Sequence, residues 1–399
     1  MATQHDGLSR GRRFPELIES YRASFTSMEK PADLIILLTY CMTMYAPIRI
    51  CVEAGVFRRL SASAHPLSAD ELAKSIEGIP QSASAHESAE REEFLGRMIR
   101  AVCALDLIDD AGARGYAANE LTETLADPGF EAGFVMLFAN TFGPSSVTNS
   151  LFEWAKDHAY TAPTTSTDGP VQQAYGFPGK TTFQFWVHDE PSHMSNLSAL
   201  MKRIQQDRLN WSAWFPANIL FTSTEPGEGR AFMVDVGGGL GHDLAGFAGR
   251  YPDKSIRLVL QEQPEVIQEA KEQDLDSRIE LSEHDFFAPQ PVKGANIYFM
   301  HKIMHDWPDR DCVRILSHLR DAMSADSRLF SNDCILPDQG SPLIYAAFDI
   351  GMLSWLSAKE RSETMWKRLV SQVDGLVIRN FWQAPGLKGE GIVEVGMSA

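Results

Sequence analysis

The chain has 399 residues, of which 44% are apolar, so it is long enough to bury two hydrophobic cores. Its 36 basic and 53 acidic side chains give a net charge of −17, which disfavours binding to nucleic acid or to an anionic membrane. The five cysteines are odd in number and show no C-x-x-C spacing, which indicates a reducing compartment and no disulfide framework or structural zinc. We therefore expect a cytoplasmic protein of two or three domains that binds no metal.

Residues 1–125 are predicted to form a mostly helical domain. The first 13 residues lack an apolar signal core, and their three arginines indicate a disordered tail. The most apolar stretch, Leu34 to Val52, is interrupted by Tyr40, Pro47 and Arg49. These interruptions favour a buried helix pair at a subunit interface over a membrane span.

Two helices and a hairpin are predicted later in the same domain. Apolar residues recur at helical spacing in 67–76 and 94–107, and a glycine-rich turn at 112–115 then separates two short strands. This order is typical of a winged helix, whose usual partner is DNA. However, the second helix balances its two arginines with two glutamates, and the whole chain is acidic. A role in dimerisation or as a lid is therefore favoured over DNA binding.

Residues 126–228 are interpreted as a helical linker that also contributes to a substrate pocket. Helical stretches rich in aromatic residues alternate here with a polar loop at 161–170. Most of the aromatic side chains should belong to the core, and a minority should line an apolar pocket for a flat substrate. The candidates for that pocket are Phe183, Trp186 and Met201.

Residues 229–399 alternate strands with helices, which predicts an α/β domain with a parallel sheet and ligands at the carboxyl ends of the strands. The predicted strands are 231–236, 257–260, 279–283, 295–300 and 328–333. The predicted helices start at 242 and cover 264–272, 309–323, 343–356 and 362–374. Two final strands, 376–381 and 391–395, should form an antiparallel hairpin.

A glycine-rich turn follows the first of these strands. Gly237, Gly239 and Gly241 form a G-x-G-x-G pattern with Asp235 just upstream. A dinucleotide loop would need a small residue in place of His242, and no lysine followed by Ser or Thr is present to make a phosphate loop. The pattern that remains is the one used for S-adenosylmethionine (SAM).

The next two strand ends carry further residues suited to this cofactor. Glu262 ends the second strand, where an acid can accept both hydroxyls of an adenosine ribose. Asp285 follows the third strand, and Phe286 beside it could lie against the adenine. Since the carboxyl ends of parallel strands share one edge of a sheet, these residues favour a single cofactor site.

A candidate general base, His305, lies beyond the fourth strand in the sequence His305-Asp306-Trp307. A phenol with a pKa near ~10 and a histidine near ~6.5 differ by on the order of 5 kcal/mol for full proton transfer. The base must therefore act while the methyl group moves, with a neighbouring carboxylate to stabilise the imidazolium.

Taken together, these motifs resemble the class I SAM-dependent O-methyltransferases of the caffeic-acid type, and most closely their fungal secondary-metabolism branch. The resemblance covers nearly the whole chain and includes VDVGGGLG at 234–241, HDFF at 284–287, HDWPD at 305–309, NDCILP at 332–337 and AKER at 358–361. It implies a Rossmann-like catalytic domain, a winged-helix dimerisation domain, a homodimer and a small hydroxylated acceptor. It also implies that Asp333 and Glu360 flank the base and that His301 replaces a cofactor-contacting lysine.

The sequence therefore predicts an O-methyltransferase that acts on a hydroxyl of a small aromatic or polyketide-like metabolite, with His305 as base. One alternative is a pericyclase of the same fold that uses SAM electrostatically without methyl transfer. A second alternative is a DNA-binding regulator with a vestigial cofactor fold, which the acidic charge disfavours.

Overall fold

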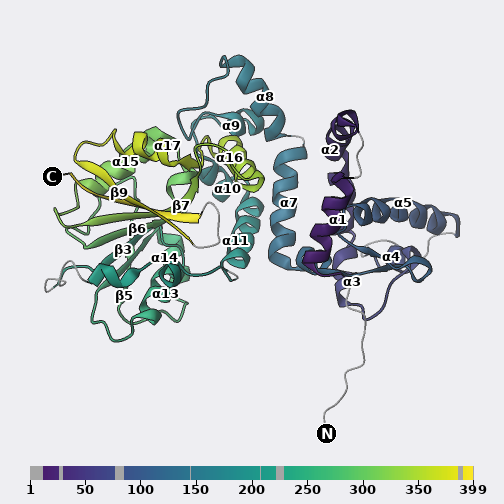
Figure 1. Cartoon of the computed structure of the whole chain (residues 1–399), viewed down its shortest axis with the longest axis horizontal. Coiled ribbons are helices and arrows are strands. Elements are labelled where there is room, and N and C mark those ends of the chain that lie inside the picture. The colour runs from purple at the N-terminus through teal and green to yellow at the C-terminus, as the bar shows by residue number, and fades with distance from the viewer. Residues whose placement is uncertain are drawn as a thin grey trace, which may run out of the picture. The chain divides into compact units, whose positions relative to one another are not determined.

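The computed structural model describes residues 12–26, 30–76, 85–143, 145–206, 208–221, 229–384 and 390–398 (Figure 1). The chain divides into two compact units, one made of Met1–Gly143 and Pro191–Asp207 and the other of Pro144–Glu190 and Arg208–Ala399. The boundaries expected at 125 and 228 differ from this division. The predicted linker is shared between the two units, because helix α11 (Pro191–Gln206) packs against α7 (Pro128–Phe142) in the first unit.

The first unit is largely helical. Its elements are α1 (Phe14–Thr26), α2 (Pro31–Glu53), α3 (Val56–Ala62), α4 (Ala69–Lys74), α5 (Ala85–Ala104), β1 (Asp109–Asp110), η1 (Gly112–Arg114), β2 (Tyr116–Ala117), α6 (Glu120–Ala126), α7 and α11. The two predicted helices correspond to α4 and α5, and β1 and β2 form the predicted antiparallel hairpin. The elements expected of a winged helix are thus present in the expected order, while the winged helix itself stays a prediction.

The most apolar stretch forms one helix, α2, and not a buried pair. The helix continues through Pro47. By length and composition alone it could cross a membrane, and only 17% of its most apolar window is buried inside the chain. Its most exposed apolar side chains are Ile35 at 62%, Ile36 at 56%, Leu38 at 54% and Tyr40 at 64%. The prediction of a helix pair is wrong, because the helix continues through Pro47 without a break. Its burial at a subunit interface stays a prediction.

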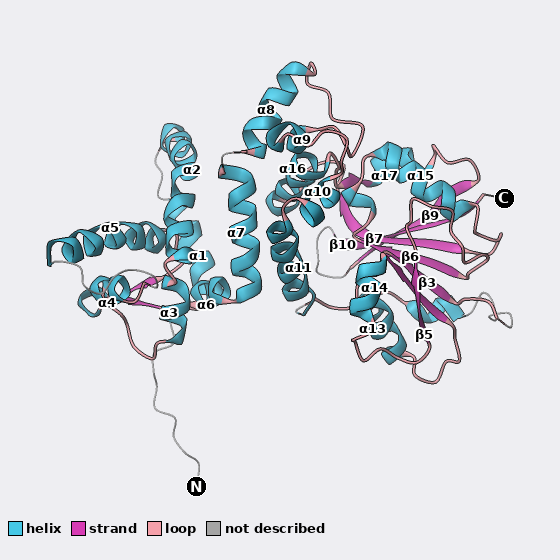
Figure 2. Ribbon diagram, turned by 180° about the vertical axis from the view of Figure 1, so that it is seen from behind, coloured by secondary structure: helices cyan, strands magenta, loops and turns pink. Residues whose placement is uncertain are grey.

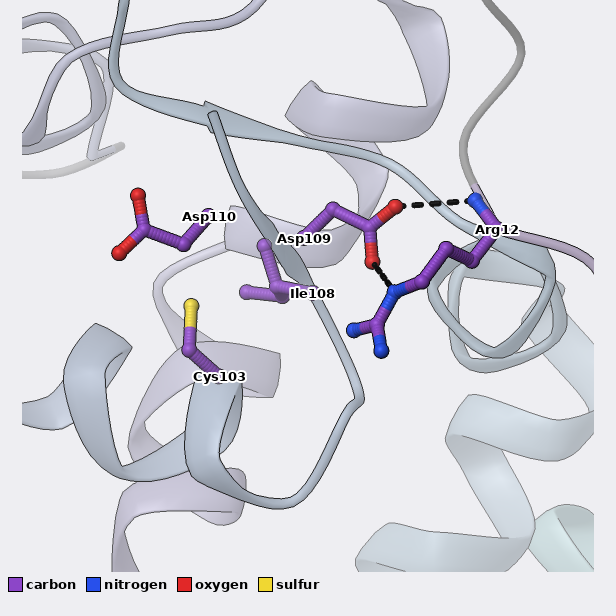
Figure 3. Close-up of a pocket in the computed structure, with 5 residues that line it drawn as sticks. All are labelled: Arg12, Cys103, Ile108, Asp109 and Asp110. Atoms are coloured by element: carbon purple, nitrogen blue, oxygen red, sulfur yellow. Dashed lines mark hydrogen bonds and ion pairs between the residues drawn. The ribbon is translucent and has the colours of Figure 1, made fainter. Parts of the chain in front are cut away.

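The described part of the amino-terminal tail is held by ion pairs. Arg12 donates from its backbone N to Asp109 Oδ2 at 2.9 Å and from Nε to Asp109 Oδ1 at 2.8 Å, and it pairs with Asp106 at 2.7 Å. A cavity of about 340 Å³ lies here, lined by Arg12, Cys103, Ile108, Asp109 and Asp110 (Figure 3). The predicted disorder is therefore wrong for Arg12, and the part of that prediction that covers residues 1–11 lies outside the described residues.

The second unit is built on an eight-stranded sheet (Figure 2). Its strands are β3 (Met233–Val236), β4 (Leu258–Glu262), β5 (Ile279–Glu283), β6 (Ile297–His301), β7 (Arg328–Leu336), β8 (Arg361–Ser362), β9 (Leu376–Gln383) and β10 (Glu390–Met397). The order is β5-β4-β3-β6-β7-β10-β9, with β8 paired to β7 off this path. Strands β3 to β8 pair in parallel, and β10 is antiparallel to both of its neighbours.

The helical elements of this unit lie before the sheet and between its strands. They are α8 (Val147–Asp157), α9 (Pro170–Tyr175), α10 (Thr182–His188), α12 (Trp211–Trp214), η2 (Ala217–Phe221), α13 (His242–Arg250), α14 (Pro264–Ala270), η3 (Met304–Asp306), α15 (Asp309–Arg320), α16 (Leu343–Leu356) and α17 (Glu363–Val370). Every strand and helix predicted after residue 230 is confirmed, with ends that shift by a few residues. The closing antiparallel hairpin is β9–β10.

Helices cover both faces of the sheet. Side chains of α15 and α17 pack in one buried cluster with Val234 and Val236, and side chains of α12 and α13 pack in another with Met233. The strand β3 thus alternates its apolar residues between the two cores, as a central parallel strand should. Since each fully buried aliphatic side chain contributes ~1.5–3 kcal/mol, both faces are fixed, and the site residues lie on the strand ends and loops at the carboxyl edge.

Candidate active site

The glycine loop packs tightly on its protein side and is open on the other. Gly237 has a φ of 72°, and a Cβ there would lie 2.7 Å from Ile303. A Cβ on Gly238 would lie 2.5 Å from the carboxyl of Asp235. A Cβ on Gly239 would meet nothing within 4 Å, although its φ of 57° also favours glycine. The loop therefore holds its backbone against the sheet and leaves space beside Gly239 for a ligand.

Three carboxyl groups gather at this loop, from Asp235, Asp243 and Glu262. Asp235 is fully buried, and neither of its oxygens accepts a hydrogen bond from the residues that the structure describes. Burial raises the pKa of Asp235 well above its usual range, and the charges of Asp243 and Glu262 raise it further. Burial also raises the pKa of Glu262, although Gln263 N donates to its Oε2 at 2.6 Å. The loop is therefore suited to a ligand that carries positive charge.

His301 lies at the end of β6 and contacts the helix that follows the loop. Its Nδ1 lies 2.5 Å from Asp243 Oδ2, and its buried Nε2 has no partner in the described part of the chain. Burial lowers the pKa of His301 in spite of Asp243. Burial raises the pKa of Asp243, but the charges of His301 and Arg208 outweigh it and lower the pKa overall. The structure thus places His301 against Asp243 of α13, and its contact with the cofactor stays a prediction.

Asp285 and Phe286 follow β5 at the same edge of the sheet. Phe287 N donates to Asp285 Oδ1 at 2.9 Å, which fixes the turn after the strand. The ring of Phe286 lies against Gly237, where a Cβ would come within 3.5 Å of Phe286 Cε1. Its centroid is 5.9 Å from that of Trp307, at an interplanar angle of 76°. Phe286 therefore joins the glycine loop to the segment that carries His305.

His305 lies on the single turn η3, and its imidazole lies between the carboxyl groups of Glu360 and Asp306. Its Nδ1 lies 2.9 Å from Glu360 Oε1, and its Nε2 lies 3.3 Å from Asp306 Oδ1. Burial lowers the pKa of His305, but the charge of Asp306 and the hydrogen bond to Glu360 outweigh it and raise the pKa to about 8. Burial raises the pKa of Glu360, and the hydrogen bond from His305 more than offsets this and lowers it. The two carboxyl groups therefore stabilise the protonated form of this imidazole.

The acids around this imidazole differ in how they reach it. Glu360, which is 2% exposed, makes the direct hydrogen bond. Asp333 lies fully buried on β7, where Ser331 Oγ donates to its Oδ2 at 2.6 Å. It acts on the pKa of His305 through its charge. Burial raises the pKa of Asp306 to about 6, against the opposing effect of His305.

The three predicted pocket residues separate into two groups. Phe183 and Trp186 lie on α10 in an edge-to-face pair with centroids 6.1 Å apart, and Phe183 lies 6.1 Å from Trp307. Met201 lies on α11, which belongs to the first unit and not to the unit that carries His305. The structure therefore brings Phe183 next to Trp307, and Trp186 packs on Phe183.

Sequence reasoning missed several residues that the structure brings to the site. Asp306 is next to His305 in the sequence, and Asp243 follows the last loop glycine by two residues, so adjacency was the available signal for both. Arg361, which contacts the turn η3, is the last residue of the AKER motif. Arg208 lies well before β3, the first strand of the large sheet, and no local sequence pattern marks it.

The arrangement defines an enzyme of the α/β class, with a cofactor loop and a carboxylate-paired histidine at one edge of a parallel sheet. A profile of the O-methyltransferase domain matches residues 168–375. The O-methyltransferase asqD of Emericella nidulans is 31% identical over 350 residues, or 87% of this chain and 84% of the relative. The O-methyltransferase lepI of Aspergillus flavus is 29% identical over 368 residues, or 92% of this chain and 90% of the relative. The chain belongs to the O-methyltransferase domain family, in its fungal secondary-metabolism branch.

Solved structures agree with this assignment. The structure of LepI in complex with SAM matches with a TM-score of 0.82 at 28% identity, covering 96% of this chain and 94% of that chain. A structure described as a pericyclic reaction enzyme matches with a TM-score of 0.81, also at 28% identity and with the same coverage. The predicted fold class is confirmed.

Proposed function

We propose that the protein is a SAM-dependent O-methyltransferase that methylates a hydroxyl of a small aromatic or polyketide-like metabolite, with His305 as the general base. The observation that carries the proposal is the buried hydrogen bond between His305 Nδ1 and Glu360 Oε1, on the sheet edge that also holds the glycine loop. Members of the family and a solved structure with SAM support the choice of cofactor.

The residues of the loop fit SAM better than a dinucleotide. When bound, SAM supplies a methyl group on a positively charged sulfonium and a second positive charge on its amino group. Asp235, with both oxygens unpaired among the described residues, and the neighbouring Asp243 would face this charge. The same carboxylates would repel a pyrophosphate. Gly237, Gly239 and Gly241 would admit the cofactor, Glu262 would accept its ribose hydroxyls, and Asp285, Phe286 and His301 would border it.

In this proposal, one nitrogen of His305 would take the proton. Because Nδ1 donates to Glu360, Nε2, which lies 3.3 Å from Asp306 Oδ1, is the nitrogen that would accept the proton of the acceptor hydroxyl. A pKa of about 8 for His305 reduces its difference from a phenol near ~10 to about 2 pH units, or ~3 kcal/mol. Proton transfer is therefore less costly than an isolated histidine would make it, and Glu360 balances the imidazolium that forms.

The acceptor would lie among aromatic side chains next to the base. Phe183 on α10 and Trp307, the residue after η3, provide flat apolar surfaces whose ring centroids lie 6.1 Å apart. Such rigid walls suit a planar ring and hold its hydroxyl in line with the methyl group, and alignment of this kind can contribute ~7–11 kcal/mol.

A pericyclase remains a second candidate, and one observation favours it: the match to a solved structure described as a pericyclic reaction enzyme. A pericyclase would use the positive charge near the loop without consuming the cofactor.

Product stoichiometry separates the two functions. The protein would be incubated with SAM and a panel of fungal phenolics, and both products would be followed by mass spectrometry. A methyltransferase forms one S-adenosylhomocysteine for each product that gains 14 mass units. Turnover of a substrate without methyl gain or cofactor loss would contradict the proposal and support the pericyclase.

A further inference from the structure

The turn that carries His305 has little stability of its own. η3 is a single 3-10 turn of three residues, its preceding residue Ile303 makes no side-chain cap, and Lys302 adopts a positive φ of 56°. Short 3-10 turns have few internal hydrogen bonds and poor bond geometry. The position of the His305 backbone must therefore come from contacts outside the turn.

Arg361 supplies these contacts. It is 1% exposed, and it donates from Nη1 to Met304 O at 2.6 Å and from Nη2 to Trp307 O at 2.9 Å. These two carbonyls lie on either side of His305. The planar guanidinium thus bridges the backbone before and after the base, which a lysine ammonium cannot do with the same geometry.

The charge of this buried guanidinium is balanced by Asp309, an acid that does not contact the imidazole. Arg361 donates to Asp309 Oδ1 from Nη2 at 2.8 Å and from Nε at 3.1 Å. Asp309 begins α15, the helix that follows the turn, and it also accepts from Lys359 at 3.0 Å. Burial raises the pKa of Asp309, but Arg361 outweighs this and keeps it low. Arg361 is therefore held between β8 and the start of α15.

The same short segment also carries Glu360, the hydrogen-bond partner of the imidazole. Glu360 directly precedes Arg361, and Arg361 begins β8, where it pairs with Ile335 of β7. Consecutive residues thus hold the side chain of His305 through Glu360 and its backbone through Arg361.

We propose that Arg361 is a positioning residue that sets where His305 lies, an inference that rests on the proposed role of His305 as the base. Arg361 touches neither the acceptor nor the cofactor in this assignment. It acts by fixing the turn, so its removal should displace the base. A displacement of about 1 Å in a reacting group can lower a rate by ~10²-fold.

The test compares Arg361→Lys with Lys359→Met, a matched control that also contacts Asp309 but does not reach η3. Arg361→Lys should lower kcat by ~10- to 100-fold, leave the affinity for SAM by calorimetry within ~2-fold, and lower activity no further when added to His305→Gln. Lys359→Met should keep kcat within ~2-fold. An additive loss in the double variant, or an unchanged kcat in Arg361→Lys, would overturn the inference.

A spectroscopic readout keeps this test separate from the proposed function. In protein with labelled histidine, the imidazole signal of His305 is identified by its loss in His305→Gln. Arg361→Lys should shift this signal and lower its titration midpoint, and Lys359→Met should not. An unmoved signal in folded Arg361→Lys would refute the positioning role even in a protein that transfers no methyl group. If Arg361→Lys does not fold, Asp309→Asn provides the comparison, with a smaller effect of the same kind expected.

Discussion

Replacement of Glu360 by glutamine removes the charge that faces His305 while it keeps the shape of the side chain. In the native protein the pKa of His305 is about 8, above its ordinary ~6.5, which corresponds to ~2 kcal/mol in favour of the imidazolium. A base must be neutral to accept a proton, so activity should be lost as the pH falls through about 8. Because Glu360 acts through both a hydrogen bond and its charge, we expect Glu360→Gln to lower this midpoint by roughly 1 pH unit.

The same change should slow the reaction where the base is neutral. The lost stabilisation of the imidazolium has an upper limit of ~2 kcal/mol, so kcat should fall by ~10- to 30-fold. The assay is the dependence of kcat/KM on pH between 5.5 and 9.5, with kcat read on the alkaline plateau. Glu363→Gln, on the exposed side of the next helix, is the matched control. A midpoint that stays near 8 in folded Glu360→Gln would refute the assignment of His305 as the titrating base.

Three further outcomes follow from the structure. Glu262→Ala should weaken SAM and its demethylated product by ~10- to 100-fold in calorimetry, because hydrogen bonds to a charged group contribute ~1.5–3 kcal/mol; equal affinity would remove Glu262 from the site. Asp235 is a buried acid with a raised pKa, so it destabilises the free protein increasingly as the pH rises above its unfolded value of ~3.8. Asp235→Asn should therefore raise the melting temperature at pH 7 by a few degrees and abolish tight SAM binding, and a lower melting temperature would contradict this account. The exposed apolar face of α2 motivates the proposal of a homodimer, which Ile35→Glu with Leu38→Glu should convert to monomers in sedimentation. A native chain that sediments as a monomer at micromolar concentration would argue against it.

Much of the second unit could be predicted because its elements are local and periodic. Apolar runs such as 231–236 and 258–260 mark buried parallel strands, and the acids at the strand ends mark the ligand edge. The sequence also indicates Glu360 as a partner of His305, although only through a family motif. These features depend on residues close together in the chain or on a pattern shared with relatives.

Other features could not be predicted because they depend on distant packing. The strand β8 has two residues, too few to leave a periodic pattern. The exposure of α2 depends on which surfaces lie against it, and an apolar helix reads the same whether it is buried or not. The packing of α11 on α7 joins segments about 60 residues apart and moves Met201 into the first unit.

The placement of Glu360 and Arg361 on one short strand has a consequence for how this site can diverge. An insertion or deletion between α16 and β8 would shift both residues together, so it would cost the partner of the imidazole and the support of its turn in one step. A substitution at position 305 would instead change the chemistry and leave the scaffold around it intact. Descendants of this chain should therefore acquire new reactions through the residue on the turn, while the strand that supports it is inherited unchanged.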